Sequence, residues 1–361
     1  MSEVVTAIAR NRAEVLAREE AAMRRMARQY RRVVRDTTKR AEALAAEITR
    51  LRAAGEEVSL GRLVRLERYQ LMLAQLGADV DAYAIRVALP EVEALQAADV
   101  WLAQEHAERV ERVALGAERA GRLQAAFVLS PSPALEALVG VMGDGGPVRE
   151  YLRQNMTAKA VQAVEDAVAR VVTGNLGPRE AARLLVTEAG KAAGVGLDRA
   201  LCITRTESLR AYREAQRGRW ADSGVVQAYR RTAAQNERTC LGCIVLDGSV
   251  WPITEPLEDH PNGRCAMVPV FIVGGQVISS WGDAPSARDW LMGAGEQTQL
   301  AVMGPGRYAA WKRGDVALED MARRVEDPTG RFGGAWVPRT VADIQATGAA
   351  GGRAGRAAVA A

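Results

Sequence analysis

Four side chains near the middle of the sequence have the types and the spacing of a metal site. Two residues separate Cys240 from Cys243, and a spacer of 16 residues then leads to His260, with Cys265 close behind it. Three of the four cysteines and one of the two histidines lie in this stretch. Thiolate and imidazole ligands at such spacing are typical of a tetrahedral zinc site. We therefore predict that Cys240, Cys243, His260 and Cys265 bind one structural zinc ion.

Four protein ligands would leave no open position on the ion, which argues against a catalytic metal. The ion would instead stabilise a β unit too small to be stable alone. Two other interpretations stay open. In the first, the thiols are ordinary buried side chains and His260 lies in a surface turn. In the second, the cysteine pair and the Asp259-His260 pair belong to a zinc-associated His-Asn-His nuclease. That reading needs His260 as a general base, and no second histidine follows it in the sequence.

Four other residues with reactive side chains are better explained by packing. Arg205 and Glu207 are two positions apart on a predicted helix, so their side chains point about 200° apart and do not face each other. We expect each to bind a different neighbour in a structural role. His106 is expected on a helix surface and Cys202 in the core, and neither is assigned a function.

A row of arginines marks one face of the first predicted helix. Between positions 24 and 40 the sequence has eight basic residues and one acid, a net charge of +7 against +4 for the whole chain. Such a face can bind phosphates or an acidic protein surface, or it can simply be solvated. Duplex DNA is the less favoured partner, because the one interleaved aromatic residue, Tyr30, lies on the apolar side of the helix and offers no platform for base stacking. The residues of this face that we single out are Arg24, Arg28, Arg31 and Arg35.

Composition separates the first half of the chain from the second. The chain has 361 residues, enough for two or three domains, and the first half is rich in Ala, Leu, Val, Arg and Glu, which favour helices. Six of the seven tryptophans lie from position 220 onwards. The first 20 residues lack the apolar core of a secretion signal, and no apolar run is long enough to cross a membrane. The few, clustered cysteines indicate a reducing compartment.

Helical periodicity predicts most of the elements that must position these side chains. We expect one helix over 3–53, a second from a Ser59 cap through Leu73, and further helix over 90–122. In the central region we expect helices from a Thr157 cap to Gly174, from Pro178 to Gly190, and over 197–221. Residues 287–321 are again helical in pattern.

The pattern becomes that of β-strands around the predicted metal ligands. Residues 225–231 read as a strand, and 244–251 read as a β-hairpin with Asp247-Gly248 as its turn. A second hairpin is expected over 268–278. We predict a predominantly α-helical α+β fold with long N-terminal helices, a central helical domain, a small zinc-pinned β-hairpin unit and a C-terminal helical extension. The expected boundaries are 1–129 for the N-terminal helices, 130–150 for a linker, 151–285 for the core with helices over 157–222 and the zinc unit over 225–280, 286–347 for the extension, and 348–361 for a disordered tail.

Five short motifs occur in a fixed order along the central region. They are GNLGPRE (174–180), ITRTESLRA (203–211), NERTCLGC (236–243), LDG (246–248) and HPNGRC (260–265). This ordered set resembles the Mu F-like head-morphogenesis proteins of tailed bacteriophages, also called minor head or minor capsid proteins. The stretch GRYAAWKRG (306–314) resembles the C-terminal extension of that family. The resemblance covers about residues 155–320. It departs from the family pattern at Gly263, where the family often has another cysteine, and it does not extend to the first 150 residues.

The resemblance implies a virion protein without enzymatic activity. Such a protein associates with the portal vertex, and assists head assembly and DNA packaging or ejection. Its expected partners are the portal protein, the major capsid protein, or both, with duplex DNA as a further candidate for the arginine face. We expect it in the virion head, and in the host cytoplasm during assembly. In the family the motif with Arg205 and Glu207 looks architectural. We also assign Asp247 and Gly248 to a structural motif. The alternatives are the nuclease described above and a DNA-binding assembly factor.

Overall fold

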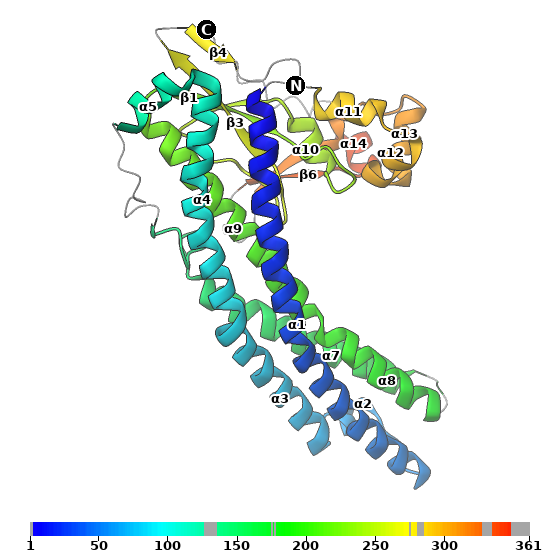
Figure 1. The fold of residues 1–361 in the computed structure, drawn as a ribbon. Helices are drawn as coiled ribbons and strands as arrows, with labels where there is room; N and C mark the ends of the chain where they lie inside the picture. The colour runs from blue at the N-terminus through cyan, green and yellow to red at the C-terminus, as the bar shows by residue number, and fades with distance from the viewer. Residues whose placement is uncertain are drawn as a thin grey trace. The chain divides into compact units, whose positions relative to one another are not determined.

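The computed structural model describes residues 3–125, 136–174, 176, 178–273, 276–279, 285–326 and 334–347. Figure 1 gives the order of the elements along the chain. The chain divides into two compact units. Unit 1 comprises Met1–Ala17, Gln96–Val139 and Thr206–Ala361, and unit 2 comprises Arg18–Leu95 and Gly140–Arg205. The predicted tail, 348–361, lies outside the described residues. No helix among the described residues is both long enough and apolar enough to cross a membrane.

Unit 2 is helical throughout its regular structure. The long helix α1 (Glu3–Ala53) enters it from residue 18, and its face with Met26, Tyr30 and Val33 is buried, as the periodicity predicts. The Tyr30 hydroxyl donates a hydrogen bond to the Ala193 carbonyl at 2.8 Å. The remaining elements of this unit are α2 (Leu60–Leu63), α3 (Glu67–Tyr83), the π-helix η1 (Ala84–Ala88), the start of α4 (Leu89–Leu115), α7 (Val148–Thr173), α8 (Pro178–Ala193) and the start of α9 (Val195–Asp222).

Three predicted helix ends in unit 2 are wrong, although the helices themselves are present. Ser59 does cap a helix, but α2 ends at Leu63, and α3 begins only after a turn with Leu66 in an extended conformation. Leucine periodicity continues across this turn and therefore does not reveal it. Thr157 lies inside α7, which already begins after Pro147. Gly190 lies inside α8: a Cβ there would be 2.8 Å from Thr38 Oγ1, so this glycine permits close packing of α1 and does not end the helix.

Unit 1 contains a four-stranded antiparallel sheet in the order β2-β1-β3-β4. The strands are β1 (Val226–Thr232), β2 (Val250–Pro252), β3 (Ala266–Val273) and β4 (Gln276–Ser279). Its helices include α5 (Ala117–Ala125), α10 (Leu241–Leu246), α11 (Ala287–Gly293), α12 (Glu296–Met303), α13 (Pro305–Lys312), the 3₁₀ helix η2 (Leu318–Met321) and α14 (Val341–Thr347). Strands β5 (Ala322–Glu326) and β6 (Gly334–Pro338) form a separate antiparallel pair. The core of unit 1 contains Trp220, Tyr229 and Phe271, which pack with aliphatic residues.

The two predicted β-hairpins have different outcomes. Strands β3 and β4 pair antiparallel, which confirms the hairpin over 268–278; its turn residues lie outside the described part. The hairpin over 244–251 is wrong. Residues up to Leu246 belong to α10, and β2 pairs with β1 through Tyr229 and Trp251. The reason is local: Cys240 caps α10, because its sulfur accepts a hydrogen bond from the Cys243 amide. The predicted fold class, predominantly α-helical α+β, is confirmed.

Candidate metal centre

Two short segments of unit 1 bring the predicted ligands together. Cys240 is the N-cap of α10 and Cys243 lies in its first turn. His260 lies in the loop between β2 and β3, and Cys265 directly precedes β3. The close packing of α10 depends on Gly242, because a Cβ there would be 2.8 Å from the Trp336 carbonyl oxygen of β6. The start of α10 thus places Cys240 and Cys243, and the start of β3 places Cys265.

The first group of donor atoms is compact. The Sγ atoms of Cys240 and Cys243 are 3.4 Å apart, and His260 Nε2 is 3.0 Å from the first and 3.4 Å from the second. Around a zinc ion with ordinary bond lengths, such donor atoms would be separated by roughly 3.5–3.8 Å. The other imidazole nitrogen, Nδ1, is 2.8 Å from the Pro261 carbonyl oxygen, so a proton on Nδ1 leaves Nε2 as the donor toward an ion.

A second group overlaps the first and contains the Asp259 carboxylate, which the predicted zinc ligands do not include. Cys243, Asp259 and Cys265 have donor atoms within 4.8 Å of one another, so Cys243 belongs to both groups. The five side chains therefore lie close enough together to bind a metal ion. All four predicted ligands are among them.

Asp259 is held by two buried guanidinium groups. Arg213 Nη2 donates to one carboxylate oxygen at 2.9 Å, and Arg231 Nη2 donates to the other at 3.0 Å. The backbone amides of His260 and Cys265 donate to the same carboxylate at 3.0 and 3.4 Å. Burial alone would raise the pKa of Asp259, but the charges of the two arginines outweigh it, and the pKa is lowered. Asp259 is therefore a charged anchor of the loop.

The two arginines also bind the loop and its sulfur atoms. Arg213, on α9, donates to the carbonyl oxygens of Gly263 and Cys265, each at 2.9 Å. Arg231, on β1, lies 3.4 Å from Cys265 Sγ. Sequence reasoning overlooked both residues. One signal was present: Arg230 and Arg231 are adjacent on a strand, and alternation must turn one of the two side chains inward.

Gly263 lies where no side chain can be accommodated. A Cβ at this position would be 2.1 Å from Asp259 Cγ and 2.2 Å from each carboxylate oxygen. The preceding residue, Asn262, has a positive φ of 65°, and its amide donates to Thr206 Oγ1 of α9 at 3.1 Å. The loop thus approaches the carboxylate at the one residue that has no side chain.

The pKa shifts differ among the three thiols and the imidazole of the centre. The hydrogen bond between the Cys240 and Cys243 thiols lowers the pKa of Cys240 and raises that of Cys243. A hydrogen bond with Cys243, together with burial, raises the pKa of Cys265 well above its usual range. The pKa of His260 is raised to about 9: burial lowers it, but the hydrogen bond with Cys243 and the Asp259 charge have the larger effect. A thiol with a lowered pKa is the better metal ligand, because the thiolate is the form that binds.

The motif residues outside the centre make structural contacts, as expected. Arg205 forms an ion pair with the buried Glu19, and Glu207 accepts a hydrogen bond from Arg210 at 2.7 Å. The Asp247 carboxylate accepts hydrogen bonds from the backbone amides of Ala233 and Ala287, at 2.6 and 2.7 Å. Asp247 therefore ties three segments together, although the hairpin predicted around it is absent. Gly248 supports the turn after α10 with a φ of 81°.

Two minor predictions need correction. His106 is fully buried, with Nδ1 at 2.8 Å from the Tyr212 hydroxyl and Nε2 at 3.2 Å from Glu14. The acidic residues near it in sequence suggested a surface position, but Tyr212 of α9 covers its ring. Cys202 is only partly buried.

The predicted arginine face of α1 is exposed to solvent. The side chains of all four arginines are exposed. Arg24 lies 3.4 Å from Glu20, and Arg35 lies 3.3 Å from Asp36. The neighbouring Arg25 is instead paired with Glu91 through two hydrogen bonds. Whether this face binds a partner stays a prediction.

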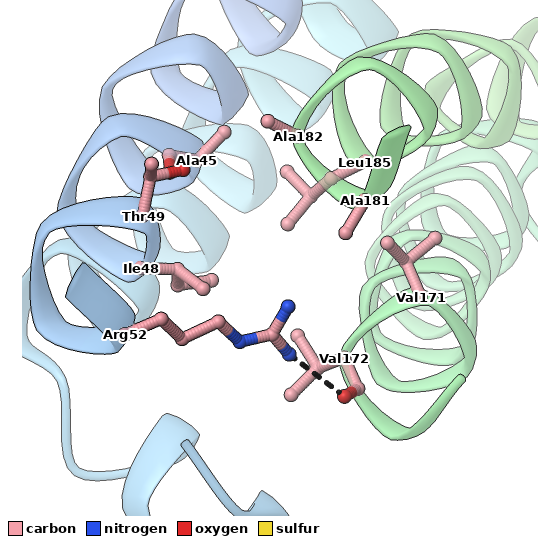
Figure 2. A pocket seen from close by; sticks show the side chains of 9 residues that line it. All are labelled: Ala45, Ile48, Thr49, Arg52, Val171, Val172, Ala181, Ala182 and Leu185. Atoms are coloured by element: carbon pink, nitrogen blue, oxygen red, sulfur yellow. Dashed lines mark hydrogen bonds between the residues drawn. The ribbon is translucent and has the colours of Figure 1, made fainter. Parts of the chain in front are cut away.

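Unit 2 also contains a small apolar pocket between α1, α7 and α8. Figure 2 shows Arg52 at its edge, with Ile48 and Leu185 among its apolar walls. Its volume is about 250 Å³ with the open solvent at its mouth included. Its two polar side chains bind backbone carbonyls: Arg52 donates to Val172 at 3.2 Å and Thr49 donates to Ala45 at 2.8 Å. We interpret the pocket as a feature of helix packing.

Comparison with known proteins gives no match: no family model, no curated protein and no solved structure is similar to the chain. The resemblance to the head-morphogenesis family therefore depends on the sequence motifs alone.

Proposed function

We propose that this chain is a non-enzymatic minor head protein of a tailed bacteriophage and that one structural zinc ion stabilises its β unit. The observation that carries the proposal is the use of the motif residues. Cysteines and histidine of two motifs converge on one cluster, and the motif residues Arg205, Glu207 and Asp247 bind charged side chains or backbone amides. A set of motifs devoted to internal contacts is what an architectural domain requires.

The donor set favours zinc over other common ions. Thiolate and imidazole donors suit zinc, whereas magnesium and calcium take oxygen ligands. The ion would be held by Cys240, Cys243, His260 and Cys265. Asp259 would not bind the ion but would position the loop of His260 through its hydrogen bonds with the loop and with the two arginines. Bound zinc would contribute stability by holding α10 against the strand start.

The contacts of His260 weigh against the nuclease alternative. A general base needs one imidazole nitrogen free to take a proton from water or substrate. Here Nδ1 lies against the Pro261 carbonyl and Nε2 lies between two sulfur atoms. The same imidazole is therefore better suited to hold an ion than to activate a nucleophile.

The proposed partners are the portal protein, the major capsid protein, or both, in the virion head and during assembly in the host cytoplasm. The exposed arginine face of α1 is our candidate contact surface, with an acidic protein surface as its first target and duplex DNA as its second. Charge complementarity at such a face would accelerate association and make it sensitive to salt.

A binding experiment on the full chain tests this proposal. Purified protein is mixed with portal protein, major capsid protein or duplex DNA, and its zinc content is measured on the same sample. We expect one zinc per chain and a salt-sensitive complex with portal or capsid protein. The double variant R28E/R31E should weaken that complex, whereas R149E/R179E, which changes two exposed arginines elsewhere in unit 2, should not. Absence of both zinc and complex would refute the proposal. Binding to DNA alone would favour the DNA-binding assembly factor.

A further inference from the structure

The second donor group already surrounds a positive charge. Arg231 Nη2 lies 3.0 Å from Asp259 Oδ1, 3.4 Å from Cys265 Sγ and 3.9 Å from Cys243 Sγ. These are the three donor atoms of the second group. The guanidinium therefore takes the place in which a second ion would need to bind.

The position of this guanidinium is fixed by the fold. Arg231 is 2 % exposed, on the strand β1 at the centre of the sheet, and its Nη1 donates to the Glu258 carbonyl. Its Nε is buried without a hydrogen-bond partner. Burying Nε without a hydrogen-bond partner costs free energy. The contacts of the guanidinium with the carboxylate and the sulfur atoms must offset that cost and keep the side chain in this position.

Charge balance explains why a cation is needed. Three thiolates and one divalent ion together carry one negative charge, and Asp259 adds a second. Arg213 and Arg231 supply two positive charges, so the buried cluster is neutral. Without Arg231 it would carry a net negative charge in the core, which is strongly unfavourable.

We propose that Arg231 is the built-in second cation of the centre, which restricts the five donors to one metal ion and strengthens the binding of that ion. The inference rests on the proposed zinc centre. N–H donors to ligating sulfur atoms and a fixed neighbouring charge are outer interactions of the kind whose loss costs metal sites about 10–100-fold in affinity.

Zinc titration of the metal-free full-length protein against a chromophoric chelator tests the inference. We expect one zinc per wild-type chain, and R231M, which keeps most of the side-chain volume, should bind it about 10–100-fold more weakly. R231K keeps the charge and should lose less. R230M is the matched control, because Arg230 is adjacent on the same strand and only partly buried. Its affinity should equal that of the wild type.

Several results would overturn the inference, and each differs from failure of the proposed function. Two zinc ions per wild-type chain would show that Arg231 does not exclude a second ion. An affinity of R231M equal to that of R230M, or a loss in R231K equal to that in R231M, would remove the role of its charge. If R231M does not fold, the wild-type stoichiometry and R231K still decide. A wild-type chain that binds no zinc would instead refute the metal centre itself.

Discussion

Replacement of Gly263 by alanine should disrupt the metal loop through a single methyl group. The new Cβ would lie 2.1 Å from Asp259 Cγ, whereas ordinary contact begins near 3.4 Å. The carboxylate would therefore have to move by more than about 1 Å. Its hydrogen bonds to Arg213 and Arg231, at 2.9 and 3.0 Å, would lengthen beyond the limit for a hydrogen bond.

The expected loss of stability follows from those two bonds. A hydrogen bond to a charged group contributes about 1.5–3 kcal/mol, and breaking a buried ion pair costs about 3–5 kcal/mol. We expect Gly263→Ala to lower the free energy of unfolding by about 3 kcal/mol or more. For a unit of this size that corresponds to a fall in Tm of roughly 6–12 °C.

Thermal unfolding of zinc-loaded protein, followed by circular dichroism, measures this effect. Gly306→Ala is the control: Gly306 has ordinary backbone angles, and a Cβ there meets no atom within 4 Å, so its Tm should be unchanged or slightly higher. A Gly263→Ala protein that melts within about 2 °C of the wild type and keeps its zinc would refute the role assigned to Asp259.

Four other perturbations test the roles assigned to the metal ion, His260, Arg205 and Gly190. Removal of zinc by a chelator should lower the Tm of unit 1 and expose the core of the β unit to proteolysis; an unchanged melting curve would argue against a structural ion. His260→Ala should lose the ion and stability together, whereas a folded, zinc-loaded but inactive protein would favour the nuclease. Arg205→Met should cost about 3–5 kcal/mol in unfolding, since it removes the ion pair with the buried Glu19 carboxylate, and a neutral effect by urea denaturation would contradict this. Gly190→Ala should cost about 1–3 kcal/mol through the clash with Thr38, and the added change Thr38→Ala should recover most of it; additive losses in the double variant would contradict the contact.

The parts of this protein that could be predicted from the sequence are those encoded by neighbours along the chain. The helix α1 follows from a stripe of apolar residues that recurs every three or four positions, and that stripe also places the arginines on the solvent side. The cysteine and histidine ligands are recognisable because a metal ion requires a narrow choice of side chains at a short spacing. Pro178 begins α8 for an equally local reason, its fixed φ angle.

The environment of the metal ligands was decided only by tertiary structure. Asp259 meets Arg213 across 46 residues and Arg231 across 28, and no local rule connects such positions. The same holds for His106, which lies beneath Tyr212 although its sequence neighbours are acidic. Burial, charge pairing and close glycine contacts arise when distant segments pack. The sequence by itself therefore determined only which side chains are candidate metal ligands. The fold decided which charges surround them.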